Sequence, residues 1–152
     1  MDPMTQILSK LDYQVLEVFL FFLTVWVAWS FLYSYISGWQ KLATVYRLKD
    51  LFESDYSQGQ PARVCNWPYK HVNIGANSMG IYFGFSYFYR LSHRPLFIPW
   101  SDVATELEKG LIMNSVDMRF RLVPTVTIRL YEDLYRNILN RAGPFLDLSR
   151  RT

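Results

Sequence analysis

The feature that most constrains this chain is an uncharged stretch near the N-terminus, because residues 18–40 contain no Asp, Glu, Lys or Arg. A helix of this length would extend about 34 Å, which is enough to cross a hydrocarbon layer of about 30 Å. Tyr and Trp residues lie near both ends of the stretch, where interfacial aromatic belts form. The pattern therefore predicts a transmembrane helix over residues 18–40.

Two alternatives to a membrane anchor fit the sequence less well. A core helix of a globular protein is seldom this long without a polar stripe. A cleaved signal peptide would have a basic N-terminal region and a shorter apolar run, whereas residues 1–17 contain Lys10 against Asp2, Asp12 and Glu17. We interpret the segment as an uncleaved anchor that follows a short N-terminus of residues 1–17.

The flanking charges predict the orientation of the anchor. Lys41, Arg47 and Lys49 follow the span, while Lys10 and the amino terminus precede it. By the positive-inside rule, the N-terminus is extracytoplasmic and residues 41–152 are cytoplasmic, so we expect a single-pass protein of the cell (inner) membrane. The single cysteine, Cys65, excludes an internal disulfide and agrees with a reducing compartment.

Within the span, Ser30, Ser34 and Gly38 recur every four residues and therefore lie along one side of the helix. Small residues with this spacing permit close helix approach, so they form a candidate face for self-association or for a partner helix. The alternative is a chance occurrence of small residues that a membrane helix tolerates.

After the span, the sequence predicts a short helix, a linker and an antiparallel sheet. Trp39, Leu42, Ala43 and Tyr46 have helical spacing, and the polar stretch 53–61 reads as a loop, so residues 41–61 are assigned to a juxtamembrane helix and linker. Alternating residues between turn signals predict about seven strands, at 62–67, 71–74, 80–91, 96–100, 103–109, 117–123 and 125–130. An amphipathic helix over 131–142 closes the domain, which spans 62–142, and residues 143–152 form a tail.

Two motifs carry a resemblance. The run Asn77-Ser78-Met79-Gly80-Ile81-Tyr82, a basic hairpin, and then Phe97-Ile98-Pro99-Trp100-Ser101-Asp102-Val103 resemble the small PH-like or GRAM-like domains of bacterial membrane proteins. With Ser37-Gly38-Trp39 after the anchor, residues 37–142 are similar to uncharacterised single-span bacterial proteins that carry such a domain. The resemblance implies an α+β fold, in which a strongly bent antiparallel sheet of seven strands precedes a C-terminal helix. It brings no catalytic residue with it.

Composition and motifs argue against several function classes. Hydrophobic residues make up 51% of the chain and charged residues 19%, which excludes disorder, and a net charge of +3 does not indicate nucleic-acid binding. The sequence lacks the spacing motifs of zinc, nucleotide and dinucleotide sites. Its two histidines, His71 and His93, stand in no recognisable triad and are expected at the surface or at caps. We therefore expect no enzyme activity, no cofactor and no metal.

Two surfaces remain as candidate binding sites. In the aromatic strand 80–91, Tyr82 and Phe88 are expected on the face opposite the core, with a shallow groove at Gly84, as a contact for a protein partner. The alternative is that the juxtamembrane helix or residues 145–152 cover this face. Arg90, His93 and Arg94 form a basic hairpin tip, which is either a contact for anionic lipid headgroups or a solvated turn.

Three arginines on the last strands need acidic partners. If the hairpin turns at Pro124, Arg119 lies opposite Arg129 and the two charges repel. Glu106 and Glu108 are the expected partners of Arg119, Arg121 and Arg129, in preference to a phosphate-binding patch.

The sequence thus predicts a membrane-anchored, non-enzymatic interaction or scaffolding module that presents its domain to a protein partner. An anionic-lipid-sensing domain and an accessory subunit of a larger membrane complex are the alternatives.

Overall fold

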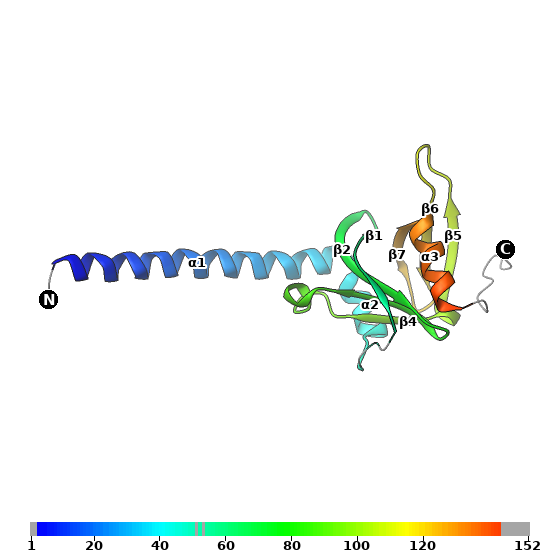
Figure 1. Cartoon of the computed structure of the whole chain (residues 1–152), viewed down its shortest axis with the longest axis horizontal. Coiled ribbons are helices and arrows are strands. Elements are labelled where there is room, and N and C mark those ends of the chain that lie inside the picture. The colour runs from blue at the N-terminus through cyan, green and yellow to red at the C-terminus, as the bar shows by residue number, and fades with distance from the viewer. Residues whose placement is uncertain (1–2, 51, 53, 144–152) are drawn as a thin grey trace.

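The computed structural model describes residues 3–50, 52 and 54–143, and consists of a long helix followed by a β-rich domain (Figure 1). The α-helices are α1 (Pro3–Ile36), α2 (Trp39–Tyr46) and α3 (Glu132–Ala142). The strands are β1 (Tyr56–Val64), β2 (Trp67–Ala76), β3 (Gly80–Phe85), β4 (Leu96–Pro99), β5 (Val103–Glu108), β6 (Ser115–Phe120) and β7 (Val123–Tyr131). The short 3-10 helices η1 (Tyr87–Tyr89) and η2 (Trp100–Asp102) flank β4. Residues 144–152 of the expected tail lie outside the described residues.

Helix α1 projects from the domain as a single rod, with most of its length free of contact (Figure 1). Its segment Asp12–Ile36 is long and apolar enough to cross a membrane, with a mean hydropathy of 2.1, and its large apolar side chains are mostly exposed. The prediction of a long apolar N-terminal helix is confirmed. The predicted bounds of 18–40 are wrong at both ends, because the helix begins at Pro3 and ends at Ile36, before the turn at Gly38.

The domain is a curled antiparallel sheet that forms an incomplete barrel. Its seven strands lie in the order β4-β3-β2-β1-β7-β6-β5, and α3 packs against β2, β6 and β7. Successive side chains of a strand point to opposite faces of the sheet, and those on the inner face form the core. The buried residues are Val116, Met118 and Phe120 of β6 and Val126, Ile128 and Leu130 of β7. The expected seven strands and C-terminal helix are confirmed.

Helix α2 belongs to the core of the domain. Trp39, Leu42, Ala43 and Tyr46 are all buried, as their helical spacing predicts, but they pack inside the sheet rather than in a separate linker. The chain turns into α2 at Gly38, whose φ of 86° is left-handed. A Cβ at Gly38 would lie 2.8 Å from a methyl group of Val126, so both the backbone conformation and the close packing require glycine here.

Several predicted boundaries are wrong for identifiable reasons. Strand β1 begins at Tyr56, so part of the expected linker is strand, with a register shift near Gly59 that accommodates its positive φ. Strand β3 ends at Phe85, and Tyr87–Tyr89 form η1 instead of continuing it. The last hairpin turns at residues 121–122, which leaves Leu122 exposed. Pro124 falls in the register shift of the β6–β7 pair, where no ladder N–H is needed.

Two arginines of this hairpin have the predicted glutamate partners, whereas Arg121 pairs with Asp102 at 2.8 Å instead. Arg119 pairs with Glu106 at 3.1 Å, and Arg129 pairs with Glu108. Arg119 faces Thr127 and not Arg129, because the turn precedes Pro124. Arg129 instead lies opposite Asp117 and donates to it at 2.6 Å, which raises the pKa of the Arg129 guanidinium. The predicted repulsion is therefore absent.

Candidate functional site at the helix–domain junction

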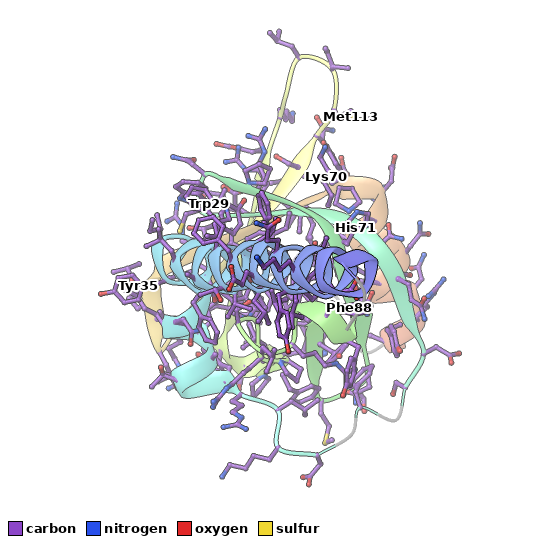
Figure 2. The ribbon with its side chains drawn as sticks, turned by 90° about the vertical axis from the view of Figure 1, so that its left-hand side faces the viewer. Trp29, Tyr35, Lys70, His71, Phe88 and Met113 are labelled. Atoms are coloured by element: carbon purple, nitrogen blue, oxygen red, sulfur yellow. The ribbon has the colours of Figure 1, made fainter. Side chains whose placement is uncertain are left out.

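Helix α1 meets the domain within a ring of aromatic side chains from three segments. We call this ring the aromatic collar, and its members are Trp26, Trp29, Tyr33, Trp67, Tyr87, Phe88 and Tyr89. Ring centres of Trp26 and Tyr89 lie 5.8 Å apart, and those of Tyr33 and Trp67 lie 5.1 Å apart. In the view down α1, Trp29 and Phe88 lie on opposite sides of the helix (Figure 2). Aromatic side chains of α1 therefore pack against those of β2 and η1 where α1 leaves the domain.

Beneath the collar, hydroxyl groups and one imidazole join α1 to the domain. We call this set the polar clamp; it consists of Ser30, Ser34, Ser37, Tyr69, Ser92 and His93. The hydroxyl of Ser34 donates to the Ser92 carbonyl at 2.7 Å, and the hydroxyls of Ser30 and Ser92 are in contact.

The imidazole of His93 occupies the centre of the clamp. Its Nε2 lies 3.0 Å from the Tyr69 hydroxyl, which in turn lies 2.7 Å from the Ser37 hydroxyl. Its Nδ1 lies 2.8 Å from the Ser92 hydroxyl. Trp39 packs beside the ring and donates its indole N–H to the Arg94 carbonyl at 3.0 Å. Both ring nitrogens of His93 are thus satisfied inside the protein, as buried polar atoms require.

Burial sets the charge state of the clamp. Removal from water lowers the pKa of His93 to about 4, although a hydrogen bond to the Tyr89 backbone opposes the shift. Burial likewise raises the pKa of Tyr69 above its ordinary value of 10.0. Both groups are therefore neutral at pH 7, and α1 is held by uncharged hydrogen bonds.

The Ser92–His93 pair lacks the accessible hydroxyl and the carboxylate partner that nucleophilic catalysis by serine and histidine requires. The side chains of both residues are buried, and the outer partner of the imidazole is a tyrosine hydroxyl rather than a carboxylate. A histidine with a pKa near 4 is also a weak general base at neutral pH. The geometry favours a positioning role for the pair. Within the described part of the chain, no three His, Cys, Asp or Glu residues gather as metal ligands would.

A groove of about 290 Å³ opens between α1 and the start of β2. Trp26, Trp29 and Phe85 supply apolar walls, and Tyr69 and His93 of the clamp contribute polar groups. Lys70 and His71 also line it, and both are exposed. Figure 2 shows these two residues on the face of the domain from which α1 emerges.

The small residues predicted as a helix-association face are used within the chain. Ser30 and Ser34 bond to Ser92, and Gly38 packs on Val126 of β7. This side of α1 therefore faces its own domain. Their four-residue spacing does reflect close packing, but the packing partner comes from the same chain.

The expected partner face of Tyr82, Gly84 and Phe88 does not exist as one surface. Tyr82 is buried beneath Phe52, with ring centres 4.6 Å apart, and its hydroxyl occupies the space beside Gly84. Burial raises the pKa of Tyr82. Phe88 is 76% exposed and lies in η1, because β3 ends before it. Tyr82 is covered, as the alternative expected, but its cover is Phe52, which follows the juxtamembrane helix rather than belonging to it; residues 145–152 lie outside the described residues.

The basic tip of Arg90, His93 and Arg94 is also divided by the structure. His93 is 3% exposed, so its expected surface position is wrong. Arg90 and Arg94 are exposed, and Arg90 Nε donates to the Phe85 carbonyl at 3.4 Å. The backbone N–H of His93 donates to the Tyr89 carbonyl and closes the turn after η1, in which the His93 side chain points inward.

Sequence reasoning missed Ser92, Tyr69, Lys70 and the hairpin tip Leu111–Met113. Only the tip had a local signal, since three apolar residues follow Gly110 in a turn between two strands. The others contact α1 from distant parts of the chain.

Comparisons of this chain with protein-family models, with curated proteins and with solved structures found no match.

Proposed function

We propose that this chain is a single-span membrane protein whose PH-like domain acts as a non-enzymatic interaction module at the cytoplasmic surface of the cell membrane. The apolar segment Asp12–Ile36 supports the anchor, since its 25 residues would extend about 38 Å. The basic residues that follow it support a cytoplasmic domain. The order of seven strands and a C-terminal helix supports the PH-like assignment.

The observation that carries the proposal is an exposed apolar tip beside the anchor. Tyr87, Phe88 and Leu91 are 81%, 76% and 70% exposed, an unusual concentration for a surface in water. Phe88 and Leu91 line a crevice with Trp26 and Phe31 of α1. The tip therefore lies beside a part of α1 that would be inside the bilayer. If α1 spans the membrane, the tip enters it as well, and these side chains are removed from water.

The depth of the tip can be measured with a fluorophore at Phe88. In a Cys65→Ser background, Phe88→Cys carries an environment-sensitive dye, and the full-length protein is reconstituted into vesicles. We expect blue-shifted emission that a lipid-borne quencher reduces, because the tip enters the interfacial region. Leu111→Cys in the same background is the matched control, since Leu111 is fully exposed on the β5–β6 hairpin. Equal, water-like emission at both positions would contradict the proposal.

A specific observation also favours a protein partner at a second surface. Leu111, Ile112 and Met113 are exposed at the tip of the β5–β6 hairpin, which projects from the body of the domain (Figure 1). We propose this tip as the contact of the scaffolding module, in place of the Tyr82 face.

Affinity purification from native membranes in mild detergent tests the hairpin contact. We expect Ile112→Ser to reduce recovery of a stoichiometric partner severalfold, because a buried Ile side chain contributes about 1.5–3 kcal/mol. Met79→Ser, which alters another exposed apolar residue on a different loop, should leave recovery unchanged. A lone 18.1 kDa species in both wild type and variants would argue against a stable partner.

A further inference from the structure

The groove between α1 and β2 has two chemically different parts. Its walls are aromatic, from Trp26 and Trp29 of α1 and Phe85 of β3, while Lys70 and His71 lie at its exposed margin. Trp26 and Trp29 belong to the apolar segment Asp12–Ile36, so the apolar walls are continuous with the proposed transmembrane surface. A ligand that fits both parts must itself be amphipathic.

The charge of the residues that line the groove favours a negatively charged ligand. Among its lining residues there is no Asp or Glu, whereas Lys70 supplies an ammonium group and the His71 imidazole supplies a ring N–H donor. A negatively charged, phosphate-containing headgroup is complementary to this margin.

We propose that this groove binds one anionic phospholipid, with its acyl chain against Trp26 and Trp29 and its headgroup at Lys70 and His71. The inference rests on the proposed membrane location, which brings bilayer lipid to the open side of the groove. It assigns the headgroup contact to the start of β2, and not to the Arg90–Arg94 tip expected from sequence. The polar clamp keeps the two walls at a constant separation, since it bonds α1 to the loop that carries Ser92.

Native mass spectrometry of the full-length protein in mild detergent tests the site. Phosphatidylglycerol and phosphatidylcholine are added separately, and occupancy of the first lipid adduct is measured. We expect tighter binding of phosphatidylglycerol, and a decrease of about fivefold or more for Lys70→Gln combined with His71→Gln. Lys49→Gln combined with Arg119→Gln removes surface charge at two exposed residues that do not line the groove, and should not alter occupancy. Trp29→Ala should weaken binding of both lipids, because it removes an apolar wall.

Three outcomes would overturn the inference. The first is equal binding of the two lipids, and the second is wild-type occupancy in the Lys70 and His71 variant. The third is displacement of the lipid by an equal concentration of glycerol 1-phosphate, which would indicate a simple phosphate site. Unchanged thermal unfolding of the variant excludes misfolding, as expected for two exposed side chains. Failure of the proposed membrane location has a separate readout, namely water-like emission from the Phe88→Cys probe.

Discussion

Replacing Trp39 with alanine is expected to lower the free energy of unfolding of the domain by about 3–5 kcal/mol. Trp39 is 1% exposed and packs against Tyr69, Phe85 and His93. The substitution would create a cavity beside the polar clamp and leave the Arg94 carbonyl without its indole donor. A loss of this size is a large fraction of the free energy of unfolding of an ordinary domain, which is about 5–15 kcal/mol.

Equilibrium urea unfolding of the full-length protein in detergent, followed by circular dichroism, measures this effect. Trp39→Phe should lose less, because it retains much of the buried volume, and Trp67→Ala is a control at a 37% exposed tryptophan. A Trp39→Ala midpoint equal to that of Trp67→Ala would disprove the placement of α2 in the core. The same reasoning predicts that a fragment starting at residue 41 is unstable, since it omits Trp39.

Acidification from pH 7 to about pH 5 is expected to remove about 2 kcal/mol of stability through His93 alone. The pKa of His93 is about 4 in the folded protein, against 6.5 when exposed, so the unfolded chain binds the proton more readily. Stability is therefore fully present above pH 6.5 and is lost as the pH falls from 6.5 towards 4. Tyr69 and Ser92, the side chains bonded to the imidazole, stay neutral throughout this range.

Comparison of wild type with His93→Gln isolates this contribution. The variant should be less stable at pH 7, because glutamine cannot reproduce both ring hydrogen bonds, but its stability should change much less between pH 7 and pH 5. Glu132, whose pKa is lowered by hydrogen bonds from Asn114 and Arg136, titrates below this window and does not obscure the result. A parallel pH dependence in both proteins would show that His93 is not buried as described.

The elements that could be predicted from sequence are those whose signal is local. Residues 18–40 identify an apolar helix because a run without charge has few other stable environments. The spacing of Trp39, Leu42, Ala43 and Tyr46 identifies the buried face of α2, and strict alternation identifies Val126, Ile128 and Leu130 as core. Glu106 and Glu108 were likewise identifiable as partners of arginines with the same two-residue spacing.

The candidate site was beyond such reasoning, because its parts are distant in the chain. Ser30 meets Ser92 and Tyr33 meets Pro68 only when α1 docks on the curled sheet, and Tyr69 meets His93 only when β2 and the turn after η1 come together. The end of β3 at Phe85 also has no local marker, since the alternating aromatic pattern continues through Tyr89. Tertiary packing decided that Tyr82 is covered, that Phe88 is exposed and that His93 is internal.

The sequence by itself therefore determined a long apolar helix and a seven-stranded sheet closed by an amphipathic helix, because periodicity and charge depletion act within one element. Only the tertiary structure decided that α2 belongs to the core, that Ser30, Ser34 and Gly38 face their own domain, and that a groove with Lys70 and His71 opens beside α1. The physical reason is that burial and hydrogen-bond partners depend on which elements pack together. The sequence pattern of one helix or strand does not specify which element it packs against.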